Sequence, residues 1–228
     1  MKSIAQAFTI LTPISEGGLE ELKRIELIGR VCYKSENRIT EDGESAKQFV
    51  KMLIDSGHEA MIEHSSLSVK FYVDRGISHE IVRHRVSSFG QESTRYVNYS
   101  AEKFGREITT IDIESGFKYD KKLRKLDSDV LGSIYAEWLD AMNDAEKHYM
   151  RMLDLGATPQ IARSVLPTST KTELVMTANY REWRHFFKLR TGRTAHPQMR
   201  EIAIKLLNAL KQQLPVIFDD IELVGEDT

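Results

Sequence analysis

The segment at residues 66–73 constrains the fold of this chain more than any other. Its apolar residues, Leu67, Val69, Phe71 and Val73, alternate strictly with serine, lysine and tyrosine. Successive side chains of a β-strand point to opposite faces of a sheet, so this alternation predicts a strand with one buried face. Such a strand needs partner strands and a layer that covers its apolar face.

Partner strands are predicted at residues 4–11, where alanines break the alternation, and at residues 170–178, which are rich in β-prone residues. The covering layer is predicted to be helical, because apolar residues recur at every third or fourth position. Helices are predicted at residues 18–33, 77–86, 127–155, 179–189 and 198–213. A further helix carries the apolar residues 46–54 and ends at Gly57. A short helix starts at Thr158-Pro159, carries Arg163 and stops before Pro167. Residues 97–128 fit no clear pattern, and residues 225–228 are expected to fray.

These elements predict a mixed α/β fold in which a small sheet is flanked by long helices, within a single domain of residues 1–228. The 228 residues suffice for one large domain, and 41% hydrophobic and 29% charged residues are ordinary for a soluble globular protein. The single cysteine, Cys32, fits a reducing cytosol. The sequence shows neither a signal-peptide core nor a membrane-spanning run, so we expect a cytoplasmic protein that does not associate with membranes.

Residues 83–96 concentrate the chemistry of the first half of the chain. Arg83-His84-Arg85 places two guanidinium groups beside an imidazole, and Ser93-Thr94-Arg95 places hydroxyls beside a third guanidinium. The planar guanidinium fork suits phosphates and carbonyl edges, and a hydroxyl beside backbone N–H groups is typical of a phosphate pocket. A solvated basic surface is the alternative, but the run lacks lysine and is bounded by Phe89 and Tyr96. The segment is expected to start at the end of a helix and to continue as a loop.

Two other segments carry clustered charge. Residues 57–64 contain two histidines and two glutamates, but position 62 is isoleucine, so the His-Glu-x-x-His spacing of zinc proteases fails, and no metal site is predicted. Histidines satisfied by loop backbone remain the alternative there. Residues 181–200 hold six basic residues against the single acid Glu182, which predicts a second positive patch that meets the first.

The pattern Arg-His-Arg, seven residues, then Ser-x-Arg resembles the signature of the flavin-dependent thymidylate synthases. The resemblance extends over residues 50–210. Its supporting pieces are Gly57-His58-Glu59, Glu63-His64, residues 162–167, Asn179-Tyr180-Arg181, Leu189-Arg190 and His196.

The resemblance implies an enzyme of nucleotide biosynthesis, a flavoprotein methyltransferase that converts dUMP to dTMP. Methylenetetrahydrofolate would supply the carbon, and flavin adenine dinucleotide (FAD) would carry electrons from NAD(P)H. The resemblance also implies a homotetramer with sites shared between subunits.

The resemblance assigns residue roles as follows. The catalytic residues would be Arg190, which faces the pyrimidine edge and favours an ionised ring, and His58, which lies beside the flavin and the substrate. The FAD-binding residues would be Arg83, His84, Arg85, Gln91, Asn179, Arg181, His185 and His196. The dUMP-binding residues would be Glu80, Arg83, Gln91, Ser93, Thr94, Arg95, Arg163 and Arg190. Three positions depart from the family pattern. Many members have Asn where this chain has Gly90 and Glu where it has Gln91, and members often have a small hydroxyl residue where it has Ala60.

No side chain is expected to attack the pyrimidine covalently. Cys32 is in phase with Ile25 and Ile28 on the predicted helix 18–33, which indicates an inert, buried thiol, and Ser93 has no base at a recognisable spacing.

A nucleic-acid-binding module that uses both arginine clusters, with Tyr96 and Tyr99 as stacking platforms, is the alternative function. The net charge of −2 counts against nucleic acid as a partner.

Overall fold

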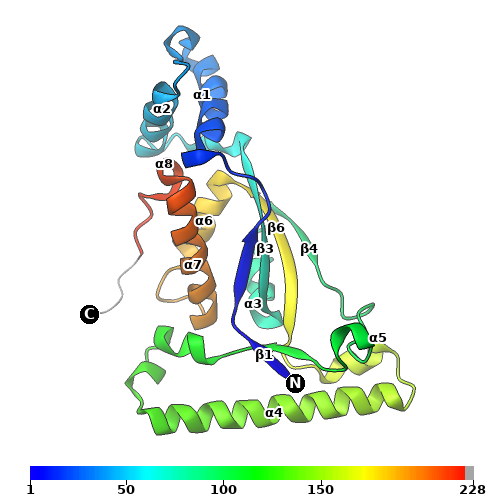
Figure 1. Cartoon of the computed structure of the whole chain (residues 1–228). Helices are drawn as coiled ribbons and strands as arrows, with labels where there is room; N and C mark the ends of the chain where they lie inside the picture. Colours follow the sequence, from blue (N-terminus) through cyan, green and yellow to red (C-terminus); the bar gives the residue numbers. More distant parts are fainter. Residues whose placement is uncertain (224–228) are drawn as a thin grey trace. The chain divides into compact units, whose positions relative to one another are not determined.

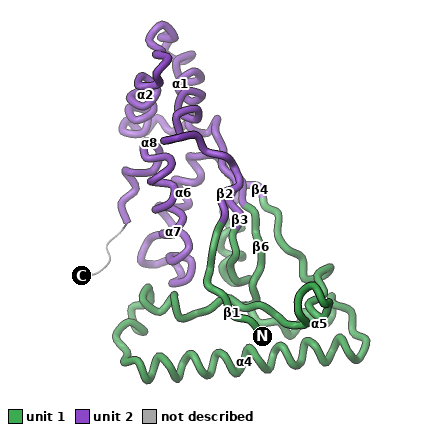
Figure 2. The backbone as a smooth tube through the Cα atoms, viewed as in Figure 1, with its two compact units in different colours: residues 1–8, 71–83, 89–175 green, residues 9–70, 84–88, 176–228 purple. Residues whose placement is uncertain are grey.

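The structure is a computed structural model that describes residues 1–223, and it shows a mixed α/β protein with two small sheets and several helices (Figure 1). The expected fraying of residues 225–228 lies outside the described residues. The fold divides into two compact units (Figure 2). Unit 1 contains residues 1–8, 71–83 and 89–175, and unit 2 contains residues 9–70, 84–88 and 176–228.

The larger sheet has four strands in the order β2-β3-β6-β4, and each of these strands continues from one unit into the other. Their bounds are β2 Ala7–Ile10, β3 Ser66–Asp74, β6 Lys171–Asn179 and β4 Ser87–Gln91. The strand predicted at residues 66–73 is confirmed, because Leu67, Val69, Phe71 and Val73 are all fully buried in β3. The strand predicted at residues 170–178 is confirmed as β6.

The strand predicted at residues 4–11 is confirmed for residues 7–10, which form β2 next to β3, but its start is wrong. The chain forms β1 (Lys2–Ile4) and β2, which belong to different sheets. β1 pairs in parallel with β5 (Thr109–Ile111), so that Ser3 lies opposite Thr110. The residues that separate β1 from β2 include Gln6, which is buried. The broken alternation of this segment therefore marks the point where the chain changes sheets.

Helices form most of unit 2. Their bounds are α1 Leu19–Tyr33, α2 Glu44–Asp55, α6 Tyr180–Arg190, α7 Pro197–Gln213 and α8 Pro215–Phe218. Gly57 follows α2 with a φ of 71°, as expected for a glycine that ends a helix. Trp183, Phe186 and Phe187 of α6 are fully buried, and the indole Nε1 of Trp183 donates to the Leu67 carbonyl at 3.0 Å. This aromatic cluster fixes the position of α6 within unit 2.

Unit 1 contains α3 (Arg75–Ile81), α4 (Ser128–Asp154) and α5 (Pro159–Ala162). The span of α4 confirms the prediction for residues 127–155, but only Met142 and Tyr149 are buried along it. Trp138 is half-buried, so the expectation that its apolar residues belong to a core is only partly confirmed. Short 3-10 segments complete the chain at Glu16–Gly18, Glu36–Arg38, Glu59–His64, Glu102–Phe104, Glu114–Tyr119, Leu123–Lys125 and Arg163–Val165.

The helix predicted at residues 77–86 is placed incorrectly. α3 starts at Arg75, where the Asp74 carboxylate accepts from the Ile77 amide at 2.6 Å, and it ends at Ile81. Residues 87–91, expected to be a loop, form β4 because they are hydrogen-bonded in the sheet. Arg83, His84 and Arg85 therefore lie outside the helix.

Among residues 1–223, no helix combines the length and the apolar character needed to cross a membrane.

Candidate functional site

A pocket of about 460 Å³ opens in unit 2 beside the first turns of α6. This volume is within the usual range for small-molecule sites. α6 begins after Asn179, whose side-chain oxygen accepts from the Glu182 amide at 2.8 Å. The helix N-terminus therefore presents its positive dipole end beside the pocket. The residues that line the pocket are Glu59, Glu63, Val86, Asn179, Arg181, Glu182, His185 and Lys188.

His84 is the most buried of the proposed site residues in unit 2, with 4% of its surface exposed. Its Nδ1 lies 2.9 Å from Oε1 of Glu182, and its Nε2 lies 3.1 Å from Nε of Arg190. The ring packs against Phe186 at a centroid distance of 5.0 Å and against His185 at 5.7 Å. The structure thus brings three of the proposed site residues together, His84, His185 and Arg190, and adds Glu182, which was assigned no role.

The environment of His84 favours a neutral imidazole. Burial lowers the pKa of His84, the hydrogen bond with Glu182 opposes this shift, and the charge of Arg190 lowers the pKa further. The Nε–H of Arg190 can only donate, so Nε2 of His84 must accept and the ring proton must sit on Nδ1. The contact with Glu182 is therefore a hydrogen bond from a neutral ring.

The positive patch predicted for residues 181–200 is largely neutralised within unit 2. Arg181 pairs with Glu63, and Lys188 lies 3.6 Å from Glu59. Both acids come from the 3-10 segment Glu59–His64, far away in sequence, so a count within residues 181–200 missed them. The Arg181 and Glu63 side chains are about half exposed, and an exposed pair of this kind is weak enough for an anionic ligand to replace the glutamate.

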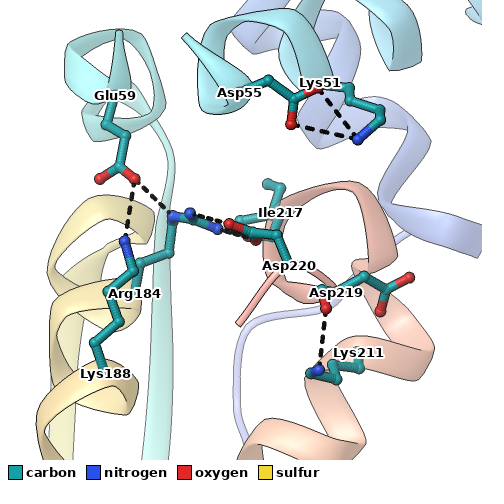
Figure 3. A network of polar contacts seen from close by, with 9 residues as sticks. All are labelled: Lys51, Asp55, Glu59, Arg184, Lys188, Lys211, Ile217, Asp219 and Asp220. Atoms are coloured by element: carbon teal, nitrogen blue, oxygen red, sulfur yellow. Dashed lines mark hydrogen bonds and ion pairs between the residues drawn. The ribbon is translucent and has the colours of Figure 1, made fainter. Parts of the chain in front are cut away.

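Arg184 belongs to the structural framework rather than to a basic surface. Its side chain is 2% exposed and lies between Glu59 and Asp220 (Figure 3). Nη1 and Nη2 donate to the two Asp220 oxygens at 2.6 and 2.7 Å, Nε donates to Glu59 at 3.0 Å, and the Ile217 carbonyl accepts from Nη1. Burial opposes the charge of Arg184, but the Asp220 and Glu59 carboxylates raise its pKa. This ion network ties the edge of the pocket to the chain after α8.

In unit 1, the second half of the motif also has internal contacts. Nη1 of Arg163 donates to the buried Thr94 hydroxyl at 3.3 Å, and Nε of Arg95 donates to Gln160 at 3.3 Å. Nε2 of Gln91 donates to the hydroxyls of Ser78 and Thr172 at 2.9 and 3.2 Å. The structure therefore brings the Thr94 hydroxyl and the Arg163 guanidinium into contact.

The other proposed residues lie as follows. Arg83, Arg85, His58 and His196 are exposed, and Glu80 and Ser93 are partly buried. His58 Nδ1 lies 3.3 Å from the Tyr33 hydroxyl, and the His196 ring accepts from the Gln198 amide at the start of α7. The proposed residues divide between the units, with Glu80, Arg83, Gln91, Ser93, Thr94, Arg95 and Arg163 in unit 1 and His58, His84, Arg85, Asn179, Arg181, His185, Arg190 and His196 in unit 2.

Sequence reasoning missed a buried polar cluster behind the motif in unit 1. The Tyr99 hydroxyl donates to Glu92 Oε1 at 2.9 Å, and Lys171 lies 3.2 Å from Oε2 of the same carboxylate. Burial, followed by the charge of Glu92, raises the pKa of Tyr99, so this hydroxyl stays protonated. Tyr99 is 6% exposed, so it cannot serve as the stacking platform of the nucleic-acid alternative. The cluster fixes the residue that precedes Ser93.

The expectation of a buried thiol is wrong. Cys32 is exposed although it is in phase with the buried Ile25 and Gly29, since it lies in the last turn of α1, where Val31 and Tyr33 are exposed as well.

A metal site has one geometric candidate among residues 1–223, formed by His84, Glu182 and His185. Both ring nitrogens of His84 already have hydrogen-bond partners, and the Arg190 guanidinium beside the ring disfavours a cation. The histidines of residues 57–64 do not belong to this cluster.

The structure thus places a buried histidine between a carboxylate and a guanidinium, next to a pocket lined by cationic side chains, glutamates and a helix N-terminus. The comparisons with known proteins give the family. Residues 19–216 match the model of the Thy1 family, described as thymidylate synthase complementing protein. The chain belongs to this family.

Relatives support the assignment. A flavin-dependent thymidylate synthase of Corynebacterium aurimucosum is 33% identical over 215 residues, which cover 92% of this chain and 84% of that protein. Its counterpart in Mycobacterium tuberculosis is 32% identical over 206 residues, covering 87% and 79%. The UMP/dUMP methylase PolB of Streptomyces cacaoi, solved with 5-Br dUMP, has the same fold, with a TM-score of 0.77, 23% identity and 96% coverage of each chain.

Proposed function

We propose that this chain is a flavin-dependent thymidylate synthase. It would reductively methylate dUMP to dTMP, with methylenetetrahydrofolate as carbon donor and NAD(P)H as reductant. The observation that carries the proposal is the hydrogen-bonded arrangement of Glu182, His84 and Arg190 beside the pocket of unit 2, in a chain of the Thy1 family. The homotetramer with shared sites belongs to the same proposal.

Three donor side chains of the pocket suit a flavin nucleotide. Arg181, His185 and Lys188 line the pocket beside the N-terminal end of α6, and phosphates and ribose hydroxyls bind such groups. Glu59, Glu63 and Glu182 also line the pocket, so the phosphates of the flavin nucleotide would replace Glu63 at Arg181 and Glu59 at Lys188. FAD, when bound, supplies the hydride chemistry that turns the transferred methylene into a methyl group. The residues of the chain would bind and orient it, with Asn179, Arg181, His185 and His196 from unit 2 joined by Arg83, His84, Arg85 and Gln91 of the motif.

The nucleotide would be held by charge and hydrogen bonds. Ser93, Thr94, Arg95 and Arg163 supply hydroxyls and guanidinium groups that suit its phosphate, and Glu80 and Gln91 offer further polar contacts. Arg190 would face the pyrimidine edge and stabilise negative charge on the ring, which makes C5 more nucleophilic. His58 would lie beside the flavin and the substrate.

Replacing Arg83 or Arg85 with alanine is expected to release bound flavin while the chain stays folded. Both side chains are exposed, so their removal should change the free energy of unfolding by less than about 0.5 kcal/mol. Lysine at either position should also weaken flavin binding, because lysine lacks the planar fork. The measurement is flavin absorbance per chain after gel filtration, with the exposed Arg151→Ala as matched control. Full flavin retention in both alanine variants would show that the assignment is wrong.

Replacing Cys32 with serine is expected to leave thymidylate formation within about twofold of wild type. Although the Cys32 thiol is exposed, no nucleophile is assigned to the reaction, and the loss of an obligatory one would cost several orders of magnitude. The check is an activity assay paired with intact-mass spectrometry during turnover. A covalent nucleotide adduct on Cys32 or Ser93 would contradict the proposal.

The choice of nucleotide distinguishes this proposal from the activity named for the structural neighbour. Incubation with equal concentrations of dUMP and UMP, followed by mass analysis of the methylated products, should yield dTMP in excess. Methylation of UMP alone would assign the chain to a ribonucleotide methylase. A colourless protein that binds a heparin column would support the nucleic-acid alternative instead.

A further inference from the structure

Glu182 is the one acid of α6, and it occupies a specific place within this helix. Glu182, Phe186 and Arg190 are spaced by four residues, which puts their side chains along one face of the helix. His84 lies against this face, with its two nitrogens hydrogen-bonded to Glu182 and Arg190 and its ring packed on Phe186. A single rigid element therefore holds both partners of the buried imidazole.

The chemistry of the three groups allows one arrangement of protons. Nε of Arg190 donates and cannot accept, so Nε2 of His84 must carry a lone pair. The ring proton then sits on Nδ1 and points at Oε1 of Glu182, 2.9 Å away. If the proton moved to Nε2, it would face the Arg190 Nε–H, and two donors would be opposed.

We propose that Glu182 is a positioning residue for Arg190, acting through His84. Glu182 accepts a hydrogen bond from Nδ1–H of His84 and so fixes the tautomer of the imidazole. The lone pair on Nε2 then fixes the plane of the Arg190 guanidinium. The directions of the two Nη groups follow from that plane. This inference rests on the proposed function for the role of Arg190 toward the pyrimidine, but the tautomer is a property of the chain itself.

The burial of these residues supports a positioning role for Glu182 over that of a solvated surface carboxylate. The Glu182 side chain is 13% exposed and that of His84 is 2% exposed, so little water competes for their hydrogen bond. Their charges also balance, since the carboxylate of Glu182 faces the guanidinium of Arg190 across a neutral ring. A buried carboxylate that selects a histidine tautomer is the same device that orients the histidine of catalytic triads.

The direct test is the tautomer of His84 in protein labelled with ¹⁵N-histidine. The ¹⁵N shifts of wild type are expected to show the Nδ1–H form, and Glu182→Gln should keep it because the amide oxygen can still accept. Glu182→Met offers no acceptor for Nδ1–H, so the proton is no longer held on Nδ1 and the signal should move toward the Nε2–H form or toward an average, with the Arg190 guanidinium displaced from its place opposite Nε2. Nε2–H in wild type, or unchanged shifts in Glu182→Met, would overturn the proposal. The Asn179 cap uses the backbone of residue 182, so each variant keeps it.

A second readout connects the tautomer to nucleotide binding. Glu182→Met is expected to weaken dUMP binding roughly tenfold, the low end for a lost hydrogen bond to a charged group, and Glu182→Gln should weaken it several times less. In an Arg190→Ala background the effect of Glu182→Met should fall below about twofold, because the group that it positions is gone. Fully additive effects would overturn the proposal. A wild-type protein that fails to bind dUMP would contradict the proposed function, and the ¹⁵N shifts would still decide the role of Glu182.

Discussion

Replacing Arg190 with alanine is expected to lower kcat for dUMP methylation by roughly 100- to 1,000-fold, the usual cost of removing one preorganised group that stabilises transition-state charge. The guanidinium is partly buried, and its Nε is held by His84 at 3.1 Å, so its charge is fixed in place before the substrate arrives. Water that fills the space left by alanine must reorient as charge develops on the ring. The measurement is the rate of dTMP formation at saturating substrates, with flavin content determined in the same sample.

Arg190→Lys is the matched comparison. Lysine keeps the positive charge but has no Nε–H to donate to His84 and no planar fork. Its activity should therefore fall between wild type and Arg190→Ala. If Arg190→Ala retains more than a third of the wild-type kcat with normal flavin content, Arg190 is not a catalytic residue.

Replacing Arg184 with methionine is expected to have the largest effect on stability. Removing one partner of a buried ion network leaves the others uncompensated and costs about 3–5 kcal/mol. We expect the lower end, because the Asp220 side chain is 42% exposed and can recover water, whereas Glu59 is 18% exposed. A loss of about 3 kcal/mol should lower the thermal midpoint by roughly 6–12 °C in a chain of this size.

Asp220→Asn and Asp219→Asn separate this network from general charge effects. Both residues follow α8, but Asp220 accepts two hydrogen bonds from Arg184, whereas Asp219 is exposed and accepts from Lys211 through its backbone carbonyl. Only Asp220→Asn should lower the thermal midpoint clearly. Equal midpoints for the two asparagine variants would contradict the role of the network.

The pH dependence of the same comparison follows from the pKa of Asp220, which the hydrogen bonds from Arg184 lower. A carboxyl whose folded pKa is lowered stabilises the fold above its unfolded pKa, near 3.8, and loses that contribution as the pH falls through the folded value. The difference in thermal midpoint between wild type and Asp220→Asn should therefore be largest near neutral pH and become smaller below pH 3.8.

The elements that the sequence predicted well are those with a strong local pattern. The alternation in β3 and the helical periodicity of α2 depend on residues close in the chain. The same holds for α6, where Asn179 was expected to begin the helix and caps it in the structure. Predictions from such local patterns are correct because the tertiary structure buries the same face of the strand or helix that the pattern defines as apolar.

Predictions failed where distant pairing decides the structure. Residues 82–91 read as a helix end and a loop, but β4 forms because it is hydrogen-bonded next to β6, some 80 residues later in the chain. β5 lies in residues 97–128, for which the sequence predicted no structure, and it forms by pairing with β1, far earlier in the chain. Neither partner can be identified from the local sequence.

The candidate site shows the same division. The motif residues were found from their spacing, but the acids that meet Arg181 and Arg184 come from residues 59–63 and from Asp220. Glu182 was visible as the single acid among six basic residues, and this isolation was the one signal that could have marked it. Its role depends on the position of His84, almost 100 residues earlier, which only the fold supplies.

The folate product of a single reaction shows where the reducing electrons come from. The purified protein is incubated with dUMP, methylenetetrahydrofolate, FAD and NADPH, and the products are separated by chromatography and weighed by mass spectrometry. If the reducing electrons come from NADPH through the flavin, each dTMP formed is matched by one tetrahydrofolate and one NADP⁺. Formation of dihydrofolate would mean that the folate supplied the electrons, and absence of dTMP would mean that the chain is not a thymidylate synthase. Either result would contradict the account.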